Sequence, residues 1–195
     1  MLSHKMVLSA LLLVSILVGT SAAKPKLKVA DDGFPTGQST PEGAASDLTR
    51  AFMRQDITLF RSVCIRPFGG GQLLSEYTGY LNGIAVHFKQ GKALATTLPD
   101  NPKRITKVFA ARHLSKNGPA SYGYAAFDFQ DVMFVDVEVI LNNGSKLMRR
   151  TLVIKDRDGK WYTLPVFDVS PLLSDGIDEE SASVRSFSDV YDVEK

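Results

Sequence analysis

The chain has 195 residues, with 23 Lys or Arg against 21 Asp or Glu, so its formal net charge is only +2 at pH 7. So small an excess does not favour attraction to nucleic acid or to an anionic membrane. Cys64 is the only cysteine, which excludes an intrachain disulfide and leaves stability to a packed core.

Residues 1–23 have the pattern of a cleavable secretory signal peptide. Lys5 precedes the uncharged run from Met6 to Val18, which is too short to span a bilayer comfortably. The small residues from Gly19 to Ala23 then suit a signal peptidase. We therefore expect a secreted or periplasmic protein, cleaved after Ala23 and without a membrane segment afterwards.

The mature chain divides into one folded domain and two extensions. Residues 24–38 contain Pro, Gly and Asp without periodicity and are expected to form a disordered linker. Residues 39–171 form the domain. Residues 172–195 are rich in Asp and Glu and are expected to form an acidic, disordered tail.

A first helix is predicted from Ser39 to Arg54. Ser39 and Glu42 have the spacing of a capping box, and Pro41 is tolerated in a first helical turn. One apolar stripe follows at helical spacing, formed by Ala44, Ala45, Leu48, Ala51 and Phe52.

Two further helices follow. Asp56 is expected to cap a short helix that ends before Pro67, with Cys64 buried on its apolar face. A third helix is predicted from about Gln72 to Phe88, with Gly91 as the C-cap.

The periodicity changes to two after Lys103, which indicates β-strands. The strands are expected at Lys103–Leu114, Tyr122–Phe129, Val132–Leu141 and Lys146–Lys155, followed by one that contains Trp161.

The Asn143-Gly144 pair predicts a two-residue type I′ turn between the two longest strands. That turn would pair Val139 with Met148 and keep one face apolar. On the opposite face it would place Glu138 beside Arg149 as a cross-strand ion pair.

The next hairpin is expected to turn at residues 157–159, with Gly159 in the left-handed bulge position. This register pairs Tyr162 with Ile154 and Leu164 with Leu152.

Helices followed by an antiparallel meander make an α+β order. Two parts of the chain carry a resemblance to a known family. They are the helical residues Thr40-Pro41-Glu42-Gly43-Ala44, Leu48, Ala51-Phe52, Asp56-Ile57 and Phe60, and the closing hairpin Asp156-Arg157-Asp158-Gly159-Lys160-Trp161. At these residues the sequence resembles the NTF2-like superfamily. This superfamily is also called SnoaL-like or the cone-shaped α+β fold. The resemblance covers about residues 39 to 170. It implies three N-terminal helices packed on a bent antiparallel sheet, with a pocket at the wide end of the cone.

The same resemblance leaves the activity open. The family includes isomerases, dehydratases, epoxide hydrolases and polyketide cyclases, and also noncatalytic binding and dimerisation domains. No local motif matches a catalytic residue of the family, so no catalytic residue is assigned.

An acid or base in an apolar pocket would have its pKa moved toward working pH, and this makes six polar residues candidates. They are His113, His87, Asp128, Asp136, Tyr80 and Tyr122. Each also has a structural interpretation. A histidine can be hydrogen-bonded at the border of the core, Asp128 can serve a turn, Asp136 can be a surface charge, and the tyrosines can be core aromatics. If the concave face of the sheet carries Phe134, Asp136 and Glu138, the two acids become the best catalytic candidates.

No metal or cofactor is expected. The His, Cys, Asp and Glu residues lack ligand spacing, and residues Gly69 to Gly71 are not followed by the Lys-Ser or Lys-Thr of a phosphate loop.

The leading hypothesis is a noncatalytic exported NTF2-like domain that binds a small apolar ligand or a protein partner, with pairing of its sheets into a homodimer. One alternative is a cofactor-independent isomerase, dehydratase or cyclase that uses a pocket Asp or His. The other is a structural extracytoplasmic interaction module.

Overall fold

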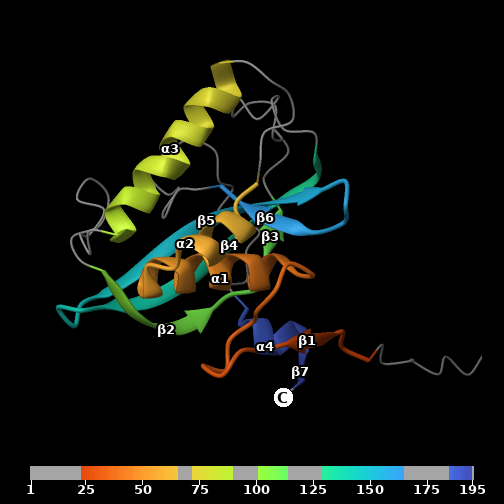
Figure 1. The fold of residues 1–195 in the computed structure, drawn as a ribbon. Coiled ribbons are helices and arrows are strands. Elements are labelled where there is room, and N and C mark those ends of the chain that lie inside the picture. Colours follow the sequence, from red (N-terminus) through yellow and green to blue (C-terminus); the bar gives the residue numbers. More distant parts are fainter. Residues whose placement is uncertain (1–22, 66–71, 90–100, 114–128, 165–184, 195) are drawn as a thin grey trace, which may run out of the picture.

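The computed structural model describes residues 23–65, 72–89, 101–113, 129–164 and 185–194, and these form a mixed α+β domain (Figure 1). The helices of these residues are α1 (Pro41–Arg54), α2 (Ile57–Val63), α3 (Gln72–Lys89) and α4 (Phe187–Val190). The strands are β1 (Lys26–Lys28), β2 (Pro102–Val108), β3 (Arg112–His113), β4 (Phe129–Leu141), β5 (Lys146–Asp156), β6 (Trp161–Thr163) and β7 (Asp192–Glu194).

The main sheet is antiparallel and has the order β2-β4-β5-β6, with β3 also paired to β4. The helix α1 crosses in front of this sheet (Figure 1). A core cluster joins Ala44 and Ala45 of α1 to Val135, Val137 and Val139 of β4. We call this side of the sheet the covered face.

A second core cluster lies between the helices. The rings of Phe52, Phe60 and Phe88 meet edge to face, with centroid distances of 5.4–5.5 Å, and Ile84 of α3 packs with them. Leu147 of β5 packs against the same cluster. The structure has a helix at each of the three predicted places, and described apolar residues of all three meet in this cluster.

The helix caps agree with the prediction in one case and differ in the other. The Asp56 carboxylate accepts hydrogen bonds from the amides of Thr58 and Leu59, as expected. The cap of α1 is Thr40 and not Ser39, because the Thr40 hydroxyl accepts the Gly43 amide at 3.1 Å. Glu42 makes no capping box, since its carboxylate is buried and bonds elsewhere.

The register predicted between β4 and β5 is wrong by one residue. Val139 pairs with Leu147 and Glu138 with Met148. The Leu141 amide donates to the Ser145 carbonyl, so the loop has three residues, Asn142 to Gly144, and only Gly144 has a positive φ (+84°). A three-residue loop with a glycine bulge replaces the type I′ turn.

The one-residue shift exchanges the faces of β5. Arg149, expected beside Glu138 on the solvated face, lies opposite Val137 on the covered face and is fully buried. The second hairpin has the predicted register, with Tyr162 opposite Ile154 and Gly159 at a φ of +78°.

The first strand of the meander is shorter than expected. It ends at Val108, and the chain resumes pairing with β4 only at Arg112. Between them Phe109 bridges to Ser186, and the Ala111 amide donates to the Glu42 carboxylate. The interruption lets α1 and the C-terminal segment bond to this edge of the sheet.

Both chain ends differ from the expected disordered extensions. Within residues 24–38, β1 pairs in parallel with β7, so that Lys26 faces Asp192 (Figure 1). Phe187 is buried in the main core and lies 6.3 Å from the ring of Phe34. A few long-range apolar contacts therefore order segments that have no local periodicity.

Residues 1–22, most of the strand expected at Tyr122–Phe129 and residues 165–184 lie outside the described residues. Among the described helices, none has the length and apolar character needed to cross a membrane.

Candidate functional site

Among the described residues, the face of the sheet opposite α1 carries five cations whose positions follow from strand pairing. Directly paired residues of antiparallel strands point to the same side, so the side chains opposite Phe134, Asp136, Glu138 and Ile140 share their face. These cations are Arg104, Lys107 and Arg112 from β2 and β3, and Lys146 and Arg150 from β5. We call this surface the basic face.

Asp136 lies in the middle of the basic face between two arginines. Arg150 binds it through Nε at 2.7 Å and Nη2 at 3.0 Å, and Arg112 donates to the same carboxylate. Its side chain is 8% exposed, while those of the arginines are 21–22% exposed. This carboxylate forms a cross-strand ion-pair bridge, and both of its oxygens are occupied by the two guanidiniums.

Glu138, the other acid of this face, is also held by neighbours. Its Oε1 accepts the Thr106 hydroxyl at 2.6 Å and lies 3.6 Å from Lys146 Nζ. The Thr106 hydrogen bond is the main cause that lowers the pKa of Glu138, and Lys146 and Lys107 add to it. Glu138 is therefore ionised at neutral pH.

The basic face keeps a cation excess after these pairings, because five cations minus two carboxylates leave +3. Arg104, Lys107 and Lys146 are exposed, and Met148 between Lys146 and Arg150 is 45% exposed. Farther along the same face Val132, Phe134, Leu152 and Ile154 are buried. The chain is nearly neutral overall, so this concentration of charge is a local feature that composition did not reveal.

The structure separates the two histidine candidates. His113 is on β3 with its side chain 69% exposed, and its Nδ1 lies 3.5 Å from Asp131. His87 is on α3, where its Nδ1 atom is buried and makes no hydrogen bond. None of the interactions among the described residues joins either histidine to Asp136. Asp128, Tyr122 and the side chain of Tyr80 lie outside them.

Sequence reasoning missed four charged residues that are buried in the described part of the chain: Glu42, Asp47, Arg50 and Arg149. Arg149 is 0% exposed on the covered face and donates to the Thr151 hydroxyl. Arg50 and Glu42 of α1 are 2% and 1% exposed. Periodicity gives no sign that Glu42 and Arg50 are buried, because α1 is enclosed over nearly its whole surface.

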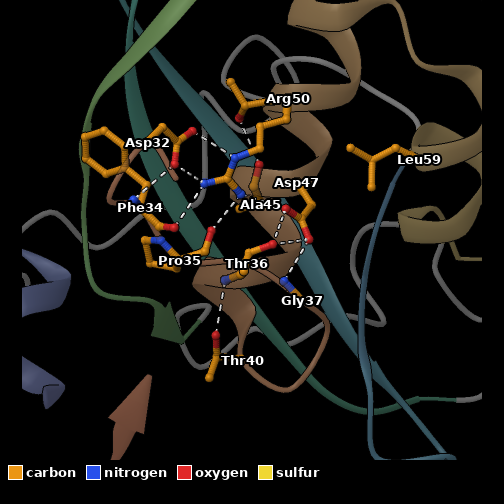
Figure 2. Close-up of polar contacts among 12 residues, drawn as sticks. Asp32, Phe34, Pro35, Thr36, Gly37, Thr40, Ala45, Asp47, Arg50 and Leu59 are labelled. Carbon is orange, nitrogen blue, oxygen red and sulfur yellow. Dashed lines mark hydrogen bonds and ion pairs between the residues drawn. The ribbon is translucent and has the colours of Figure 1, made fainter. Parts of the chain in front are cut away.

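Arg50 fastens the N-terminal loop to α1 (Figure 2). It binds the Asp32 carboxylate through Nε and Nη2 at 2.9 and 2.6 Å, and Nη1 binds Asp47 at 2.6 Å. The same guanidinium donates to the carbonyls of Phe34 and Pro35 at 3.0 and 2.8 Å. These five hydrogen bonds use every donor of the guanidinium.

The electrostatics of this cluster are those of a structural clamp. Burial opposes ionisation of Asp32, but its bonds with Arg50 and the Phe34 amide outweigh burial and lower its pKa. Burial likewise disfavours the charged Arg50, yet Asp32 and Asp47 raise its pKa further. The charges therefore stabilise one another in place, which suits a fixed loop.

Glu42 joins three distant parts of the chain. Its Oε1 accepts the Ala111 amide at 2.7 Å, and its Oε2 accepts the Tyr191 hydroxyl at 3.2 Å. Burial raises the pKa of Glu42 despite these hydrogen bonds, and burial together with Glu42 raises the pKa of Tyr191. The contacts tie the C-terminal segment to α1.

A shallow cleft of about 330 Å³ is lined by Arg61, Ser62, Cys64, Asp156 and Tyr162. Burial raises the pKa of the Cys64 thiol to about 12, so at neutral pH this cysteine is not a thiolate nucleophile. Its burial was predicted. Among the described residues, no three His, Cys, Asp or Glu side chains are grouped to hold a metal ion.

Comparison with known proteins gave no match among family models, curated proteins or solved structures.

Proposed function

We propose that the mature chain is a noncatalytic, exported domain of NTF2-like type that binds a protein partner through the basic face. The element order supports the NTF2-like assignment, because three helices precede an antiparallel meander and α1 packs across one face of the sheet. Export rests on the signal-peptide pattern of residues 1–23.

The observation that carries the binding proposal is the contrast between the two faces of the sheet. The covered face packs its apolar side chains against α1 and also buries Arg149, while the basic face presents exposed cations around Met148, which is 45% exposed. A surface that combines excess charge of one sign with an exposed thioether is suited to association. Asp136 and Glu42, which could have served catalysis, are bound in structural contacts.

A second copy of the chain is a poor occupant of this face. A twofold dimer would place the same patch against itself, so the +3 excess of each copy would face the other. Like charges placed opposite each other destabilise such an interface. The expected partner is therefore a different protein and not a second copy of the chain.

The test uses the single native cysteine. Cys64 is 2% exposed with a raised pKa, so a new surface cysteine would be the main target of a maleimide. Met148→Cys reports on the basic face, and Val86→Cys reports on α3, where Val86 is 51% exposed. Each variant is labelled in an extract of its native host and again after purification.

We expect Met148→Cys to react more slowly in the extract than in purified protein, and Val86→Cys to react equally in both. Equal rates for Met148→Cys would refute a partner on this face. If purified Met148→Cys reacts slowly at high protein concentration and faster on dilution, a second copy of the chain covers the basic face instead.

A further inference from the structure

We propose that the occupant of the basic face is an acidic polypeptide segment, an inference that rests on the proposed function and specifies its partner. The cations form ordered rows: Arg104 and Lys146 flank Ile140, and Lys107 and Met148 flank Glu138. Arg150 follows beside Asp136, and Arg112 beside Phe134. The positive charge therefore lines both sides of β4.

The spacing of these rows fits an extended chain. Alternate residues of a strand lie about 6.8 Å apart and neighbouring strands about 4.8 Å apart. Lys146 and Arg150 are four residues apart on β5, or about 13.6 Å, so acidic residues four apart in an extended peptide match their spacing. Met148, between Lys146 and Arg150 on that strand, offers an apolar contact to an intervening side chain.

The acids in the centre of the face favour a polypeptide over a phosphate-rich surface. Asp136 and Glu138 stand between the two lines of cations, and the lowered pKa of Glu138 keeps that acid ionised. A continuous layer of lipid phosphates or a nucleic acid backbone would lie over these carboxylates and be repelled. A peptide can place its carboxylates over the cations and leave neutral groups above the central row.

The binding is expected to depend on salt, because the three exposed cations lie at the surface, where ions screen their attraction. Exposed charge pairs contribute modestly one at a time. Several of them together are therefore needed for measurable binding.

The experiment measures the binding of a fluorescein-labelled oligo-glutamate peptide to the mature chain by fluorescence anisotropy. The test variant combines Arg104→Ser and Lys146→Ser, which removes the two exposed cations that flank Ile140. The matched control combines Lys89→Ser and Lys160→Ser, which removes two exposed cations outside the basic face. Vesicles containing phosphatidylglycerol and a single-stranded oligodeoxynucleotide serve as alternative ligands.

We expect the dissociation constant to rise at least about fivefold in the test variant and less than about twofold in the control, with weaker binding at higher salt. Equal weakening in both variants would overturn the proposal, because the attraction would then follow total charge only. Tighter binding to vesicles or to the oligonucleotide would overturn it in favour of a phosphate partner.

The maleimide measurement separates this inference from the proposed function. If Met148→Cys is protected in the extract but oligo-glutamate does not bind, the partner surface stands and its acidic chemistry is wrong. If Met148→Cys is not protected, the proposed function itself fails.

Discussion

The strongest test of the structural reasoning is the replacement of Arg50 by Met, which keeps much of the side-chain volume and removes all five hydrogen bonds of the clamp (Figure 2). Asp47, whose side chain is 9% exposed, would remain buried without its cation. Removing one partner of a buried ion pair destabilises a protein by about 3–5 kcal/mol.

The expected loss lies at the lower end of that range. The Asp32 side chain is 32% exposed, so water can replace part of what Arg50 provides. Asp47 also keeps its bonds from the Thr36 hydroxyl at 2.9 Å and the Gly37 amide at 2.7 Å. We therefore expect Arg50→Met to lower the free energy of unfolding by about 3 kcal/mol, and Tm by roughly 6–12 °C.

Urea unfolding of the mature protein, followed by the fluorescence of Trp161, measures this loss. Trp161 is the only tryptophan, and its amide donates to the Gln38 carbonyl at the end of the clamped loop. Arg61→Met is the control, because Arg61 is exposed, bonds to Asn82 at 3.1 Å, and its loss should change stability by less than about 0.5 kcal/mol. A loss below about 1 kcal/mol for Arg50→Met would refute the clamp.

Two further predictions concern the contacts that hold the chain ends. Burial raises the pKa of Glu42 above 4.5, so the protonated side chain is the form that favours the folded state. The stability that this protonated form contributes is fully present below the unfolded pKa, and it is lost as the pH rises through the folded pKa. Glu42→Gln should therefore be more stable than wild type near pH 8, with the difference shrinking toward pH 4.5; a difference in the free energy of unfolding that does not change with pH would contradict this. Phe187→Ala removes a buried ring worth about 3–5 kcal/mol in a core, and because the residue lies near the chain end we expect local release. Amide hydrogen exchange in residues 185–194 should accelerate while β4 stays protected, whereas Val193→Ala, at a 41% exposed position, should leave exchange unchanged. Unchanged exchange in Phe187→Ala would show that other contacts hold the segment.

Local side-chain chemistry was enough to predict the helices and one hairpin. Asp56 caps α2 because its carboxylate reaches two free amides of the first turn, a property of a few consecutive residues. Gly159 takes the left-handed position of its loop because it has no Cβ. The α+β order and the burial of Cys64 follow from the same local patterns.

The register of the β4–β5 hairpin needed the tertiary structure. The residues Asn143-Gly144 suit a two-residue turn, but Gly144 also serves a three-residue loop in which Asn143 needs no positive φ. The two loops differ by one residue of register, and that residue decides which face each β5 side chain occupies. A two-residue turn would place Arg149 at the surface, whereas the observed register buries Arg149 and brings Arg150 to Asp136.

What the sequence by itself determined, then, is the identity and order of α1, α2, α3, β4, β5 and β6, because caps, glycines and apolar spacing act over a few residues. Only the tertiary structure decided the parts that join distant residues: Lys26 with Asp192, Arg50 with Asp32, and Glu42 with Tyr191. The basic face belongs to this second group. Its cations come from strands that are separate in the sequence, and only their pairing with β4 brings them together on one side.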